Sequence, residues 1–243
     1  MSLILCIETG TDICSVGIAR DGELISLRES DEGRDHAKRV GVFVDELLRE
    51  TGVLPDELDA VAVGMGPGSY TGLRIGVSFA KGLCYALDIP LIAIGSLDAL
   101  AEVAREDFEA GILDVEETDW TQAKLCPMVD ARRMEVYAAV YDRALNVVKE
   151  TAPVVVDDAA FADLLEKHPV YFFGNGADKC EGVIEHPNAH FIDGIKPVAK
   201  NMMPLAEREH AMGAFQDVAY FEPFYLKDFV AIKSNKVDKI IRG

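Results

Sequence analysis

A glycine-rich stretch carries the clearest chemical signal in this sequence. It runs from Gly64 to Gly76 with the order GMGPGSYTGLRIG, after a buried apolar run and at the start of a helical pattern. The backbone N–H groups of such a turn can bind phosphate, helped by the helix dipole. No Gly-Lys-Ser/Thr follows, so the stretch is not a P-loop, and it does not fit the dinucleotide fingerprint with its acid on a following strand.

The glycines also predict close packing. Gly72, Gly76 and Ala80 are four residues apart and share one stripe of a helix. Each glycine inside a helix costs about 1 kcal/mol relative to alanine. Small residues in a stripe allow a second element to approach closely. The stripe therefore predicts a tight contact, either inside the fold or with another subunit.

A second polar loop follows the first expected strand. Glu8, Thr9, Thr11 and Asp12 occupy this loop, and a carboxylate there can position magnesium directly or through water. The alternative is a strand end with ordinary turn chemistry. The stretch 174–177 (GNGA) is a candidate for a second phosphate loop, although a plain turn is favoured there. Glu8, Thr9, Thr11 and Asp12 are the candidate positions of a vestigial nucleotide site.

Apolar patterning predicts an α/β protein with parallel strands, because buried strands alternate with helices. We expect strands at 3–7, 14–19, 23–27, 58–63, 91–94, 125–129, 134–141, 147–151 and 170–173. We expect helices from His36 up to Gly52 and at 69–87, 96–105, 157–167 and 203–212.

The order of these elements repeats. Both halves read β-β-β-α-β-α, and an acid precedes a turn by similar spacings, Glu8 to Asp21 and Asp130 to Asp142. We expect a first domain at 1–105 and a second at 124–243. The acidic stretch 106–123 between them has no base and predicts a solvated linker or loop. Calcium binding is the alternative for this stretch, but its spacing fits no known calcium loop.

Composition limits the class of protein. The chain has 243 residues and a net charge of −18, so alone it should bind nucleic acid poorly. The region from Lys227 to Arg242 is locally basic and is read as a solvated tail or as a contact with a partner or RNA inside a complex.

Five scattered cysteines without CxxC spacing predict core residues rather than a metal site. No apolar run approaches the ~20 residues of a membrane span, and no signal peptide is evident, so we expect a cytoplasmic protein without a membrane contact.

Four motifs resemble the TsaB (YeaZ) family. They are CIET from Cys6, GPGSYTGLRIG from Gly66, DARRMEVY from Asp130 and PFYL from Pro223. The glycine motif is highly specific and the resemblance spans the whole chain. It implies an actin-like (ribonuclease H-like) fold of two related domains, each a mixed sheet with flanking helices. It further implies a complex with TsaD, a catalytic paralogue, and TsaE, an ATPase.

The family resemblance also implies a function and an interface. The complex forms N6-threonylcarbamoyladenosine at position 37 of tRNAs that read ANN codons, from threonylcarbamoyl-adenylate. The helix after the glycine motif is the implied subunit interface. Its residues here are Tyr70, Thr71, Gly72, Leu73, Gly76, Val77, Phe79 and Ala80.

One departure argues against catalysis by this chain. The TsaD branch carries a His-x-x-x-His metal pair directly after the segment that resembles 76–91, and Ser96 and Leu100 stand there instead. Leucine cannot bind a metal. For the five histidines we expect surface or capping roles. Ser69 has no nucleophile elbow around it, which argues against a protease.

The leading hypothesis is a non-catalytic scaffold or activator subunit that needs no cofactor of its own, with ATP and a divalent metal belonging to the complex. An independent actin-fold ATPase or small-molecule kinase is the alternative. A third reading is a homodimer through the same glycine helix, because a two-fold axis makes one patch self-complementary.

Overall fold

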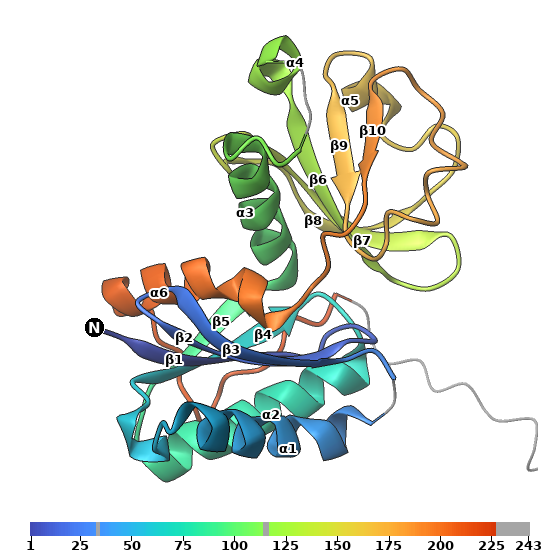
Figure 1. The fold of residues 1–243 in the computed structure, drawn as a ribbon. Coiled ribbons are helices and arrows are strands. Elements are labelled where there is room, and N and C mark those ends of the chain that lie inside the picture. The colour runs from blue at the N-terminus through green and yellow to red at the C-terminus, as the bar shows by residue number, and fades with distance from the viewer. Residues whose placement is uncertain (33–34, 114–116, 227–243) are drawn as a thin grey trace, which may run out of the picture.

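The computed structural model describes residues 1–32, 35–113 and 117–226, without the side chains of 117–119. Its first half is built on a five-stranded mixed sheet with the order β3-β2-β1-β4-β5 (Figure 1). β1 pairs antiparallel with β2 and parallel with β4, and β4 pairs parallel with β5. The expected hairpin at Asp21-Gly22 is present, with positive φ at both residues. The strands are β1 (Leu3–Glu8), β2 (Cys14–Arg20), β3 (Glu23–Ser30), β4 (Ala60–Gly66) and β5 (Leu91–Gly95).

The second sheet repeats this arrangement. Its order β10-β9-β6-β7-β8 corresponds strand for strand to the first sheet, and its antiparallel and parallel pairs fall at the same places. The internal repeat and the two-domain actin-like fold expected from the sequence are therefore confirmed. The strands are β6 (Lys124–Asp130), β7 (Glu135–Asp142), β8 (Val147–Val155), β9 (Val170–Phe173) and β10 (Ala189–Ile192).

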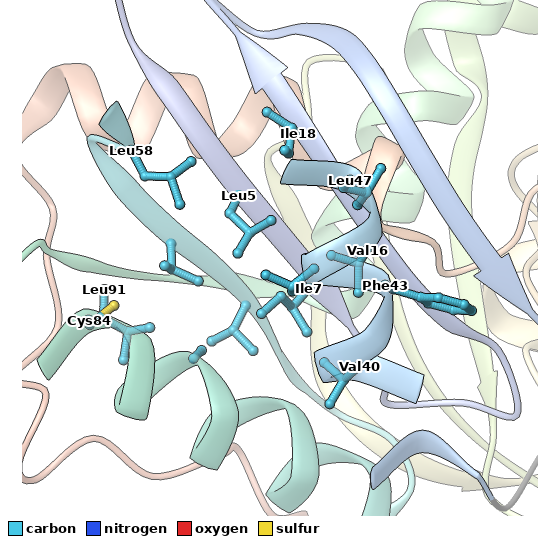
Figure 2. Packing of buried hydrophobic residues seen from close by; sticks show 14 of the residues in the cluster. Leu5, Ile7, Val16, Ile18, Val40, Phe43, Leu47, Leu58, Cys84 and Leu91 are labelled. Carbon is cyan, nitrogen blue, oxygen red and sulfur yellow. The ribbon is translucent and has the colours of Figure 1, made fainter. Parts of the chain in front are cut away.

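Two helices cover one face of the first sheet. They are α1 (His36–Thr51) and α2 (Tyr70–Leu87), which lie side by side below the sheet in Figure 1. Figure 2 shows Phe43 and Leu47 of α1 in the main core cluster, which also contains Ile7 of β1 and Val16 of β2. α1 ends at Gly52, which adopts the left-handed conformation that favours glycine. A short 3-10 helix, η1 (Pro55–Glu57), leads into β4.

The other face of the first sheet is covered by three elements, two of them from the end of the chain. They are α3 (Ser96–Glu109), the 3-10 helix η2 (Ala199–Met202) and α6 (Met203–Met212). The backbone N–H of Ala199 donates to the Ser15 hydroxyl of β2 at 2.9 Å.

The position of this terminal segment corrects the expected second domain of 124–243, because residues from Ala199 to Phe224 pack on the first sheet. The physical reason is that the outer face of the first sheet is also apolar, and little of the first half remains to cover it.

Several local expectations also differ from the structure. α3 continues through Glu109, and α4 (Glu117–Gln122) follows, so the described part of 106–123 is mostly helical rather than a solvated loop. Buried Phe108 explains the extension, because its ring stacks on Trp120 with centroids 4.2 Å apart. Residues 114–116 and the basic tail from Lys227 lie outside the described residues.

One helix of the second half is shorter than expected, whereas α6 spans the expected residues 203–212. Only α5 (Ala162–Leu165) forms within the expected helix at 157–167. β8 extends past Pro153, which an edge strand tolerates because one row of its N–H groups needs no partner. β10 was not expected, because its four residues are only half-buried and lack alternation.

All five cysteines are free and buried, as expected. None of the helices in the described part of the chain is long and apolar enough to cross a membrane.

Candidate functional site around the glycine-rich loop

Three of the recognised motifs meet at the glycine-rich loop between β4 and α2. The Ser69 backbone N–H donates to the Gly10 carbonyl at 2.6 Å, which joins this loop to the one after β1. The Phe224 N–H donates to the Met65 carbonyl at 2.8 Å, which joins it to the C-terminal segment. The rings of Tyr70 and Tyr225 lie 4.8 Å apart between centroids. Motifs more than 200 residues apart in the sequence thus form one site.

The glycines of α2 are required by contacts inside this chain. A Cβ at Gly72 would lie 2.0 Å from the Thr9 carbonyl oxygen, and one at Gly76 would lie 2.2 Å from Thr9 Oγ1. The Thr9 hydroxyl donates to the Gly72 carbonyl at 2.8 Å. The small-residue stripe therefore receives the loop after β1 and not a helix of another subunit.

This packing corrects the expected interface. Five of its eight residues are buried inside the chain and are closed to any partner, namely Gly72, Leu73, Gly76, Val77 and Ala80. The physical reason is that this face of α2 turns toward the sheet. Thr71 is exposed, and Tyr70 and Phe79 are half-buried. Phe79 packs toward Gly41 of α1, since a Cβ added to Gly41 would lie 3.3 Å from the Phe79 ring.

The outward side of the two helices carries apolar residues that the sequence reasoning missed. The Val42 side chain on α1 is 52% exposed, and Tyr85 on α2 is 85% exposed. We call Val42, Thr71, Phe79 and Tyr85 the outer surface of α1 and α2. The signal for Val42 was present in the sequence, because a valine there falls outside the apolar face set by Val40, Val44 and Leu47.

Glu8 is turned into the protein. Its carboxyl is buried and accepts a hydrogen bond from the Gly10 N–H at 2.6 Å. Burial raises the pKa of Glu8, and the hydrogen bonds from the Gly10 and Thr9 backbone oppose this only in part. A Cβ at Gly64 would lie 2.1 Å from Glu8 Oε2, so glycine is needed there too. A buried carboxyl of this kind is poorly placed to hold a hydrated magnesium ion.

The other three residues of the expected nucleotide site differ in their exposure to solvent. Thr9 and Thr11 are buried, whereas Asp12 is exposed. The Thr11 carbonyl lies 2.9 Å from Nε2 of His36, the first residue of α1. His36 is buried, which corrects its expected surface or capping role: its ring ties α1 to this loop. The loop is thus held by α1 on one side and α2 on the other.

The position of the absent histidine pair is occupied by a contact between the two halves. Leu100 is fully buried, and a Cβ at Gly174 would lie 3.1 Å from its Cδ1. Ser96 lies beside the Glu8 carboxyl, but its buried hydroxyl makes no hydrogen bond of acceptable geometry among the described residues. Across the described ranges, no three His, Cys, Asp or Glu side chains are grouped so that they could hold a metal.

The DARR motif forms a tight turn at the end of β6. Arg132 and Arg133 both have positive φ and exposed side chains. Lys179 stabilises the turn, because its Nζ donates to the carbonyls of Arg133 and Glu135 at 2.7 Å each and also contacts the Asp130 carboxylate. This turn places two cationic side chains at the carboxyl end of the second sheet.

The GNGA stretch packs against the same strand end. The Asn175 side chain accepts from the Asp130 N–H at 3.3 Å, and the Gly176 N–H donates to the Met128 carbonyl at 3.0 Å. A Cβ at Gly176 would lie 2.9 Å from the backbone of Val129. These N–H groups are used inside the protein, which fits the plain turn favoured from the sequence.

Comparisons with known proteins agree with these motifs. The family model described as TsaD, tRNA N6-adenosine threonylcarbamoyltransferase, matches residues 30–233. The Escherichia coli tRNA threonylcarbamoyladenosine biosynthesis protein TsaB is 30% identical over 95% of this chain and 96% of its own length.

Two solved Pseudomonas aeruginosa structures are also similar. One is named YeaZ and the other is described as an uncharacterized protein with similarity to peptidase YEAZ. They have TM-scores of 0.73 and 0.75 and 27% identity, over 93% of this chain and all of theirs. On the match in sequence, length and fold, this chain belongs to the TsaB (YeaZ) family.

Proposed function

We propose that this chain is a non-catalytic scaffold or activator subunit of a TsaB–TsaD–TsaE complex in the cytoplasm. The complex forms N6-threonylcarbamoyladenosine at position 37 of tRNAs that read ANN codons, with threonylcarbamoyl-adenylate as donor. In this proposal the chain binds a TsaD-type catalytic subunit and a TsaE-type ATPase and meets tRNA only through them. Its support is membership of the TsaB family, whose Escherichia coli member is named for this biosynthesis.

The contact between Leu100 and Gly174 carries the non-catalytic part of the proposal. It fills the place where the resemblance puts the second metal-binding histidine with an apolar side chain. Leucine offers no lone pair to a metal, and Ser96 alone is a weak ligand. ATP and a divalent metal therefore belong to the other subunits, and this chain requires neither.

The outer surface of α1 and α2 is the proposed docking site for the TsaD-type subunit. The resemblance assigns the interface to the helix after the glycine motif, and the buried stripe on that helix is closed to a partner. Val42 and Tyr85 are large apolar side chains that are more than half exposed on these two helices, so a partner could bury them. A homodimer would use the same residues and would compete with the heterodimer.

The independent ATPase or kinase remains the alternative with weaker support. Glu8 is buried, and the N–H groups of Gly176 and Ala177 in the GNGA turn donate to carbonyls within the protein, so fewer groups are left to bind phosphate and magnesium. Asp12 and the exposed Arg132 and Arg133 are the groups that such an activity would need.

The test is reconstitution. The masses of this chain alone, of the TsaD-type subunit from the same organism and of their mixture are measured by light scattering. The modified nucleoside is then quantified by mass spectrometry with tRNA, TsaE and ATP present. We expect a heterodimer and a yield of modified tRNA that depends on this chain. Modification by this chain without the TsaD-type subunit, or no association at any nucleotide concentration, would overturn the proposal.

A further inference from the structure

A cavity of about 270 Å³ lies between α3, α6 and the second sheet. Its walls include Asp98 and Glu102 of α3, Arg208 of α6, and Tyr141 and Leu145 from β7 and the turn after it. Both halves of the chain therefore contribute to it. The Tyr141 hydroxyl donates to Asp98 Oδ1 at 2.6 Å, a bond that joins the halves at the wall of the cavity.

This cavity lies on a different side of α3 from the Glu8 carboxyl, although Met65 of the glycine-rich stretch is among its lining residues. Asp98 and Glu102 follow Ser96 and Leu100 by two residues on α3, which places the pairs about 200° apart around the helix. Ser96 and Leu100 pack toward Glu8 and Gly174, as described above. The cavity thus lies on another side of α3.

Glu102 is an unusual residue to find in such a wall. Its side chain is only 4% exposed, and one oxygen is paired with Arg105 at 2.8 Å and, more loosely, with Arg208 at 3.6 Å. The other oxygen, Oε2, is buried and has no hydrogen-bond partner among the described residues. A buried acceptor without a partner is destabilising, so an occupant that donates to it would be bound more tightly. Glu102 is one of the residues that line the cavity.

The charges around the cavity specify the kind of donor. Asp98, Glu102 and Glu209 supply three carboxylates, against the single guanidinium of Arg208 on the wall. The remaining lining includes aliphatic side chains such as Leu205 and Leu145. One water takes up about 30 Å³, so a single water would satisfy Oε2 and leave most of the space.

We propose that this cavity binds a small molecule that carries a primary ammonium group on a short aliphatic chain. The ammonium would donate to Glu102 Oε2 and to the neighbouring carboxylates, because it has three donors and no acceptor. The aliphatic part would lie against Leu145 and Leu205. The inference stands apart from the proposed assembly with other subunits, because every group it uses belongs to this chain.

The test uses the full chain with 1,4-diaminobutane, n-butylamine and 1-butanol, followed by calorimetry and by ligand-observed NMR. We expect saturable binding of both amines and none of the alcohol. Glu102→Gln removes the charge and should weaken amine binding at least tenfold. Glu106→Gln is the matched control, because Glu106 is exposed on the same helix, interacts with the same Arg105 and does not line the cavity.

A second variant and two further ligands complete the test. Ala93→Leu extends a side chain at the cavity wall and should block the amines if Glu102→Gln proves unstable. Glycine and β-alanine carry a carboxylate as well as an ammonium group. If either binds more tightly than the amines, Arg208 also recognises the carboxylate, and the proposal is still supported. Absence of amine binding at 10 mM, equal binding of 1-butanol, or amine binding unchanged in both Glu102→Gln and Ala93→Leu would overturn it.

Discussion

Thr9 and Gly76 touch so closely that no methyl group fits between them. The first residue lies in the loop after β1 and the second in the middle of α2, and a Cβ on Gly76 would lie 2.2 Å from Thr9 Oγ1. The same threonine also donates to the Gly72 carbonyl at 2.8 Å. This contact sets the distance between the first strand and the helix, and it decides what substitutions in the stripe do.

Gly76→Ala should therefore destabilise the protein. The added methyl must displace Thr9 or α2, and overpacking of this kind costs about 1–3 kcal/mol in the free energy of unfolding. Gly82→Ala is the matched control on the same helix, because nothing lies within 4 Å of its Cβ position. We expect that control to gain about 0.5–1 kcal/mol from helix propensity. Urea denaturation of the three proteins measures both effects, and equal stability of Gly76→Ala and the parent would contradict the packing.

The same contact rules out Gly76→Arg as a test of the interface. An arginine cannot fit beside Thr9, so its loss of assembly would report a damaged fold rather than a lost partner contact. The spacing of Gly72, Gly76 and Ala80 identifies the stripe but does not identify what the stripe meets.

Glu8→Gln should stabilise the protein at neutral pH. Burial raises the pKa of Glu8, so the folded state favours the neutral carboxyl more than the unfolded state does. The stability that this preference contributes is complete below the unfolded pKa of about 4.3 and is lost as pH rises through the higher folded pKa. Glutamine keeps an acceptor for the Gly10 N–H and carries no charge at any pH.

The gain of Glu8→Gln should be largest at pH 7–8 and should shrink as pH falls toward about 4. Unfolding by urea at a series of pH values measures it. Glu23→Gln, at an exposed position on β3, serves as the control and should leave the pH dependence nearly unchanged. A Glu8→Gln curve parallel to that of the parent would show that the carboxyl is not penalised by burial.

The five cysteines should not react with a thiol reagent in the native protein at pH 8. Burial raises the pKa of Cys6 to about 12 and those of Cys14 and Cys84 to about 11, so little thiolate forms. Cys126 and Cys180 are buried with raised pKa values as well. Titration with a chromogenic disulfide should give close to no thiol in buffer and five in denaturant. Fast reaction of any one in buffer would mark a local opening.

The sequence predicted the fold better than the site, for a physical reason. Alternation and helical spacing report which residues share a face, and this sufficed for every described strand except β10 and for α1 and α2. They do not report what that face meets, so the direction of the Gly72 and Gly76 stripe was missed. The return of residues 199–224 to the first sheet was missed similarly, because chain order does not show that the outer face around Ile4 and Ile92 needs a cover.

The partner surface gives the sharpest test of the proposed function. Val42→Asp places a charge on the outer surface of α1 and α2, where the parent side chain is 52% exposed, so it should leave the free energy of unfolding within about 0.5 kcal/mol. If this surface docks the TsaD-type subunit, burying an unpaired carboxylate there should weaken association by more than tenfold. Light scattering and calorimetry with the TsaD-type subunit measure it.

Val147→Asp is the matched control for this surface. Val147 begins β8 on the second sheet and is 51% exposed, so the substitution matches in chemistry and in exposure but lies on an edge strand rather than on a helix. We expect it to assemble normally, with full yield of modified tRNA in the reconstituted mixture. If both variants assemble, the partner does not use Val42; if both fail, the loss follows from added charge on an already acidic chain. Only failure of Val42→Asp alone assigns the interface to α1 and α2.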